Sequence, residues 1–169
     1  DTATGRFEFW SWGYHHWGVD PMPYHIEPID GPIANPEMYK EYPLIATSGG
    51  RSYEFFHSEH RQLETMRAFH PWPFATMHPD LAAEKCIKAD DWVWIERPHG
   101  RCRQKAFLFD GIKPDTIHME HAWWFPEEEA AEPSLFGVFD ANINNMTKNF
   151  ETGQGGIGSG IKSFLARIE

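Results

Sequence analysis

The sequence is poor in cysteine. It holds only Cys86 and Cys102 among its 169 residues. Their spacing matches no zinc or redox motif, and two cysteines are too few for a disulfide scaffold or for the ligands of an iron–sulfur cluster. We therefore expect two free thiols in the core and no iron–sulfur cluster within this segment.

Long apolar runs are also missing, and the start of the chain shows no leader peptide. A membrane-spanning helix needs about 18–20 consecutive apolar residues, and no run comes close to that length. No charged segment followed by an apolar one opens the chain. Because Asp1 stands in place of a methionine, we expect a fragment of a longer protein, with any localisation signal upstream.

Positive charge is scarce, since 15 Lys and Arg face 25 Asp and Glu and leave a net charge of −10. An acidic surface repels phosphate backbones, which excludes broad nucleic-acid binding. One phosphate group held by local donors is still compatible with this composition. The chain also lacks a GxSxG nucleophile motif and any other recognisable catalytic set.

What the chain has is 13 Pro, 14 Gly and 15% aromatic residues, a composition that favours short strands between turns. A helix is predicted over 78–86, where Pro79 suits the first helical position, and a short helix or turn within 57–69. Strands are predicted at 7–10, 43–47, 91–96, 102–109, 117–124 and 161–168. This pattern predicts one mainly β domain, a closed or nearly closed barrel with few short helices.

The N-terminal quarter of the chain differs from the rest. Five prolines between positions 21 and 36 break regular structure, so we expect an extended arm over 1–41 and the barrel over 42–169. The arm carries four clustered aromatic residues, Trp10, Trp12, Tyr14 and Trp17. Such a cluster needs a covering surface, either the core of this domain or a domain outside the chain.

A glycine-rich segment at 153–158 matches the GxGxxG pattern. The Rossmann interpretation needs a helix after it within a βαβ unit, but only eleven residues follow Gly158. A Walker A loop fails too, because Ile161 stands where the lysine is required. The alternatives are a plain surface loop or a loop whose backbone approaches a ligand, and we favour the second because Gln154 and Lys162 flank it.

Two further motifs carry polar groups. Residues 47–51, Thr-Ser-Gly-Gly-Arg, follow a predicted buried strand and could bind an anion, or form a plain turn with a surface arginine. Two pairs of histidines have a spacing that allows both rings to share one helical face, as in some metal sites. They are His57 with His60 and His118 with His121. Ordinary polar surface is the alternative for each pair.

The order of these motifs resembles a known domain. Residues 42–51 (YPLIATSGGR), 56–61 (FHSEHR), 78–83, 91–95, 142–147 (NINNMT) and the glycine-rich end with Lys162 occur in the order found in one domain. That domain is the molybdopterin-dinucleotide-binding domain at the end of the large subunits of the dimethyl-sulfoxide-reductase family. Residues 4–8 resemble the link into it. The aromatic-rich segment 123–127 is closer to the thiosulfate/polysulfide-reductase and acetylene-hydratase-like branch than to nitrate reductases.

The resemblance implies a six-stranded double-psi β-barrel and a molybdopterin guanine dinucleotide that carries molybdenum or tungsten. It implies a larger prokaryotic oxidoreductase of anaerobic respiration, in which this segment is inactive alone and contacts the remaining domains of the parent chain. Electron-transfer subunits are further implied partners. Neither a catalytic residue, a metal ligand nor an iron–sulfur cluster is implied here. Carried over to this sequence, the implied cofactor-binding residues are Thr47, Ser48, Gly49, Arg51, His57, Ser58, Arg61, Asn144, Gln154 and Lys162.

The sequence departs from the family where Gly49 and Gly50 stand in place of the one glycine of many relatives. An alternative alignment therefore moves the positions carried over to Ser48 and Gly49 by one residue. The rival hypothesis is a stand-alone, cupin-like metal-binding barrel that uses the histidine pairs, and a third is a non-catalytic interaction domain. The rival requires a third or fourth ligand near one pair. The favoured hypothesis requires four side chains around one cleft, namely Arg51, His57, Asn144 and Gln154.

Overall fold

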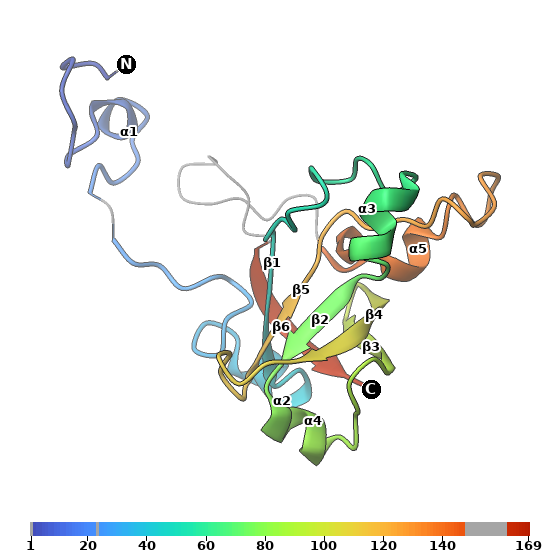
Figure 1. The fold of residues 1–169 in the computed structure, drawn as a ribbon. Helices are drawn as coiled ribbons and strands as arrows, with labels where there is room; N and C mark the ends of the chain where they lie inside the picture. The colour runs from blue at the N-terminus through green and yellow to red at the C-terminus, as the bar shows by residue number, and fades with distance from the viewer. Residues whose placement is uncertain (1, 23, 148–161) are drawn as a thin grey trace.

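A computed structural model describes residues 2–22, 24–147 and 162–169, and its centre is a closed barrel of six strands (Figure 1). The strands are Leu44–Ser48 (β1), Phe74–Met77 (β2), Trp92–Arg97 (β3), Gly100–Leu108 (β4), Thr116–Met119 (β5) and Ser163–Ile168 (β6). Around the barrel they follow the order β1-β5-β2-β4-β3-β6. The pairs β1/β5 and β2/β4 are parallel although their strands are not consecutive. The prediction of a mainly β, six-stranded barrel with few short helices is confirmed.

The parallel pairing of β1 with β5 brings two distant segments to one rim of the barrel. Ser48, the last residue of β1, is in register with Met119, the last residue of β5. The segments that follow these two strands therefore begin side by side. Strand β6 adds a third segment, because the N–H of Ser48 donates to the carbonyl oxygen of Lys162 at 3.1 Å.

Side chains alternate between the interior and the outside of the barrel, as period-2 strands require. In β4, Cys102, Gln104 and Ala106 are buried while their neighbours are more exposed. Cys102 is a core thiol as predicted, and burial raises its pKa to about 12. Cys86 is exposed, so its predicted core position is wrong. Its φ of 57° turns the chain just after α4, where the next residue, Ile87, packs against the core instead.

The predicted helix is present as α4, Pro79–Glu84. Pro79 lies in the first turn, and Nδ1 of His78 accepts a hydrogen bond from the N–H of Asp80 at 3.1 Å. The remaining helices are short, namely Trp12–His16 (α1), Pro36–Glu41 (α2), Glu64–Phe69 (α3), Val138–Ala141 (α5) and the 3₁₀ helix Ile143–Met146 (η1). Among the described residues, no helix combines the length and apolar character that crossing a membrane requires.

Some predicted strands differ from the structure. Residues 7–10 are irregular, and the last strand begins at Ser163 instead of 161. The strand predicted over 117–124 ends at Met119, and the N–H of Glu120 is shared between the carbonyl oxygen of Phe74 at 3.3 Å and the side chain of Gln104 at 3.1 Å. Ala122, with a φ of 57°, then turns the chain. Strand β2 was not predicted, since the prolines just before it at 71 and 73 break the sequence pattern.

Among the described residues of the N-terminal arm, those that contact the barrel lie in its second part. A buried ion pair joins Asp30 to Arg97 at the end of β3. The segment before residue 23, including α1, lies apart from the barrel in Figure 1, and Trp10, Trp12 and Trp17 of the aromatic cluster are 38%, 52% and 60% exposed. Within the described residues the barrel therefore does not cover the aromatic cluster. The division of the chain at residue 42 stays a prediction.

Candidate functional site

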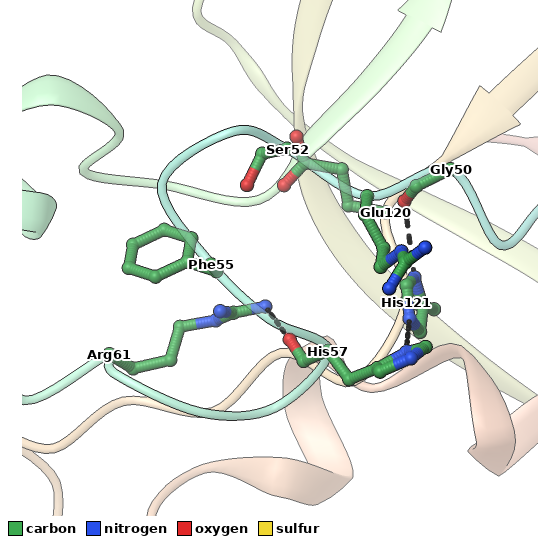
Figure 2. A pocket seen from close by; sticks show the side chains of 8 residues that line it. Gly50, Ser52, Phe55, His57, Arg61, Glu120 and His121 are labelled. Carbon is green, nitrogen blue, oxygen red and sulfur yellow. Dashed lines mark hydrogen bonds between the residues drawn. The ribbon is translucent and has the colours of Figure 1, made fainter.

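The candidate site lies at the rim where β1 and β5 end. It combines the segment after β1, the loop 55–61 and the segment after β5, which point their side chains toward one another (Figure 2). Its lining residues are Gly50, Arg51, Ser52, Phe55, His57, Arg61, Glu120 and His121. Closure of the barrel thus assembles the pocket from segments that are distant in the sequence.

The two consecutive glycines after β1 are needed for different reasons. Gly49 has a φ of 95°, which side chains rarely tolerate, and the side chain of Lys162 passes beside it. A Cβ atom on Gly50 would lie 2.8 Å from Nε2 of His118, so the missing side chain leaves room for that imidazole. Nδ1 of His118 is hydrogen-bonded to Oγ1 of Thr47 at 3.0 Å. Burial lowers the pKa of His118 and favours its neutral form.

Arg61 lies buried beneath the loop instead of facing solvent. Its Nη2 donates to the carbonyl oxygen of His57 at 2.9 Å, and its Nη1 donates to that of Glu59 at 3.4 Å. The guanidinium lies 4.1 Å from the ring centroid of Phe55 and 4.3 Å from that of Trp123. Burial lowers its pKa to about 10, so the group is still cationic near pH 7. In this position Arg61 holds the loop.

The loop itself folds back with its carbonyl groups turned inward. The indole N–H of Trp124 donates to the carbonyl oxygen of Ser58 at 2.6 Å, so with the two bonds from Arg61 three successive carbonyls face the protein. His57 and His60 have φ values of 53° and 73°, in the left-handed region that is costly for residues other than glycine. The inward hydrogen bonds stabilise this backbone and leave the side chains of His57 and Ser58 exposed.

A histidine between two carboxylates supports the wall of the pocket. Nε2 of His70 lies 2.8 Å from Oε1 of Glu120, and its Nδ1 lies 3.5 Å from Oε2 of Glu54. The fully buried Gln104 donates to the carbonyl oxygen of Glu120 at 2.7 Å and accepts from its N–H. Glu120 is therefore fixed through both backbone and side chain. Its negative charge partly compensates the buried guanidinium of Arg61.

Most residues predicted to bind a cofactor lie at this rim. They are Thr47, Ser48, Gly49, Arg51, His57, Ser58, Arg61 and Lys162, of which Arg61 is buried. Asn144 lies on η1 and has no recorded contact with the rim within the described part of the chain. Gln154 and the glycine-rich segment fall outside the described residues. Arg51 and His57 both line this pocket, and the convergence of Arg51, His57, Asn144 and Gln154 around one cleft stays a prediction.

Sequence reasoning missed three polar residues of the site, Glu120, His70 and Gln104. Gln104 looks like any outward polar residue in a β-strand, and its burial depends on its partner Glu120 across the barrel. His70 stands next to a proline-rich turn that gave no signal. Glu120 was placed inside a strand that in fact ends one residue earlier.

The histidine pairs do not form the metal site that the rival hypothesis requires. Nδ1 of His57 lies 2.9 Å from Nε2 of His121, and His118 pairs with Thr47, so each predicted pair is split between other partners. In residues 2–22, 24–147 and 162–169, no group of three or more His, Cys, Asp or Glu residues is arranged to hold a metal ion. The cupin-like hypothesis is not favoured.

Comparison with known proteins agrees with this geometry. Dopamine dehydroxylase of Eggerthella lenta is 43% identical over an alignment 175 residues long. The alignment covers 99% of this chain and 16% of that protein. Acetylene hydratase of Syntrophotalea acetylenica is 36% identical over 136 residues, which cover 80% of this chain and 18% of that protein. The solved structure of acetylene hydratase from Pelobacter acetylenicus matches 98% of this chain and 23% of its own, with a TM-score of 0.82 and 30% identity.

The chain spans about a sixth of the length of these curated relatives. The model of the molydopterin dinucleotide binding domain matches residues 45–163, which begin in β1 and include the whole rim. The resemblance inferred from the motif order is thereby confirmed. The barrel, the rim and these matches together show that the chain belongs to the molydopterin dinucleotide binding domain family.

Proposed function

We propose that this rim holds the diphosphate and the pterin edge of a molybdopterin guanine dinucleotide. Membership of the family supports a molybdopterin that carries molybdenum or tungsten, and the guanine form is our proposal. The observation that carries it is the gathering of donors at one rim in a chain of net charge −10. Arg51, His57 and Lys162 are all exposed there.

The residues at the rim fit such a ligand. Gly49 and Gly50 leave room for the side chains of Lys162 and His118, which therefore lie directly against the backbone after β1. The exposed guanidinium of Arg51, 5.3 Å from the ring centroid of Phe56, offers a planar set of donors to phosphate oxygens. Lys162 adds a second cation beside Gly49. A polyanionic ligand with hydrogen-bonding edges requires this combination of groups.

The chain's residues bind and orient, whereas the metal of the cofactor supplies the redox chemistry when bound. Arg51 and Lys162 neutralise the diphosphate. His57 and Ser58, exposed by the inward-turned loop, offer polar groups to the ligand. Arg61 holds that loop in place from the protein side. It acts on ligand binding through the position that it gives the loop, without contact to the ligand.

We infer that the whole protein is a molybdenum or tungsten oxidoreductase and that this segment alone is inactive. Any iron–sulfur cluster belongs to residues outside this segment. The exposed aromatic residues of the arm support a covering surface in the remaining domains of the parent chain, because apolar groups in this number are costly in water. Electron-transfer subunits are the further partners that we propose.

The test is the metal and pterin content of the full-length parent protein, measured by elemental mass spectrometry and by fluorescence of the released pterin. We expect molybdenum or tungsten together with a guanine-dinucleotide pterin. Arg51→Ala and Lys162→Ala should each lower both contents. Lys88→Ala, an exposed position in the segment after α4, is the matched control and should leave them unchanged. Unchanged metal content in both rim variants would refute the assignment, and iron, zinc or nickel without pterin would return attention to the histidines.

A further inference from the structure

Two imidazoles and a carbonyl group form a continuous hydrogen-bond chain at the pocket (Figure 2). Nδ1 of His121 lies 3.2 Å from the carbonyl oxygen of Gly50, and Nε2 of the same ring lies 2.9 Å from Nδ1 of His57. His121 follows β5 and is partly buried, whereas the His57 side chain is exposed. The chain of hydrogen bonds therefore runs from the backbone after β1 to the solvent side of the loop.

The carbonyl group of Gly50 sets the direction of this series of hydrogen bonds. A carbonyl oxygen only accepts hydrogen bonds, so Nδ1 of His121 carries the proton. A neutral imidazole has one N–H, which leaves Nε2 of His121 as an acceptor and makes Nδ1 of His57 the donor. Burial lowers the pKa of His121, and the nearby His57 and Arg61 lower it further, so the neutral form is favoured near pH 7.

The direction of these hydrogen bonds determines which ring nitrogen His57 offers to a ligand. With its proton on Nδ1, a neutral His57 presents Nε2, for which no partner is recorded within the described residues. Nε2 accepts a hydrogen bond in the neutral ring and donates one only after the ring is protonated. An anionic oxygen offers no proton, so it needs the protonated ring. The charged groups that face this pair are Arg51, Arg61 and Glu120.

We propose that His121 is a positioning residue that fixes the Nδ1–H tautomer of His57, so that an anionic oxygen binds at Nε2 of His57 with uptake of one proton. This inference rests on the proposed function for the anionic character of the ligand. Because the protonated ring binds the anion better, affinity falls as the pH rises and the ring loses its proton. The tautomer of His57 does not depend on any ligand. The tautomer and the proton uptake on anion binding can therefore be measured separately.

The tautomer is tested by NMR of the ¹⁵N-histidine-labelled 169-residue chain at pH 7.5, with the His57 signals assigned by their loss in His57→Gln. We expect a protonated Nδ1 and a bare Nε2 on His57. His121→Phe removes the acceptor and should shift His57 toward the Nε2–H tautomer. His121→Gln should restore the wild-type pattern, because its amide accepts from His57 and donates to Gly50. His99→Gln, in the exposed turn between β3 and β4, is the control and should change nothing.

Proton uptake is tested by calorimetric titration of the cofactor-free, full-length parent protein with guanosine diphosphate, in buffers of different ionisation enthalpy. We expect proton uptake that approaches one per ligand at pH 8, and binding that is about tenfold or more tighter at pH 6 than at pH 8. Because the terminal phosphate of guanosine diphosphate titrates near pH 6 as well, the uptake assigned to His57 is the part that His57→Gln loses. An Nε2–H tautomer in the wild type, or no change in His121→Phe, overturns the role of His121 while the proposed function stands. No binding of guanosine diphosphate, with the expected tautomer, overturns the proton uptake and counts against the diphosphate site itself.

Discussion

Replacing Arg61 tests whether it holds the loop instead of the ligand. In Arg61→Met the carbonyl groups of His57 and Glu59 lose their charged donors. The contacts of the guanidinium with the rings of Phe55 and Trp123 are lost as well. Methionine fills a similar volume, so the change removes the hydrogen bonds and the charge with little change in packing. We expect a less stable chain with a relaxed loop.

The magnitude follows from three contributions. A partly buried carbonyl group left without its donor costs about 1 kcal/mol, the lower end of the range for buried groups. The contact of a desolvated guanidinium with aromatic rings adds about 2 kcal/mol. Removing the charge recovers part of the desolvation penalty that lowers the pKa of Arg61 to about 10. The net loss of unfolding free energy is therefore about 2 kcal/mol, which shifts a urea midpoint by about 1 M for an m-value of about 2 kcal/mol/M.

The assay is urea unfolding of the chain followed by tryptophan fluorescence, with cofactor content measured in the full-length parent. Arg61→Met should lower both the midpoint and the content. Arg51→Met is the matched control, because its exposed guanidinium should affect the content and leave the midpoint unchanged. A wild-type midpoint in Arg61→Met would show that the loop does not depend on this residue.

Two further predictions concern stability. Asp30→Ala removes the carboxylate that forms an ion pair with the buried Arg97 and should lower the unfolding free energy by about 3–5 kcal/mol. Asp30→Leu combined with Arg97→Met should recover most of this loss. Urea unfolding measures both proteins, and equal losses in the two would contradict the reasoning. His118 and His121 have pKa values lowered from the ordinary 6.5 by burial, so the unfolded chain binds more protons than the folded chain below about pH 6.5. Stability should therefore fall as the pH falls through this range, and it should fall less steeply in His118→Gln. Parallel pH profiles of the urea midpoints of the wild type and of His118→Gln would count against neutral, partly buried imidazoles.

Local pattern was sufficient for part of the fold. The apolar run at β1, the alternation in β3 and β4 and the proline-led helix α4 were predicted close to their observed bounds, because each depends on neighbours within a few residues. The prediction of β5 was too long because the chain after Met119 is held by Gln104, a residue of another strand, and turns at Ala122 with a φ of 57°. A break of this kind leaves no trace in the local sequence.

The same limit applies to the candidate site. Residue type was enough to single out Arg51, His57 and Lys162 as donors, and the motif order was enough to indicate the family. Residue type could not separate Arg51, which is exposed, from Arg61, which is buried between aromatic rings. The need for glycine at position 50 became clear only from the structure, which places His118 against Gly50.

The sequence by itself determined the short strands, the kind of ligand that the polar residues suit and the family to which they belong. The tertiary structure alone decided which of these residues meet. The parallel register of Ser48 with Met119 places His121 beside Gly50, and this contact sets the direction of the hydrogen bonds through His57. Such contacts depend on closure of the barrel around its core. They are set by the free energy of the whole fold, which no local segment of the sequence contains.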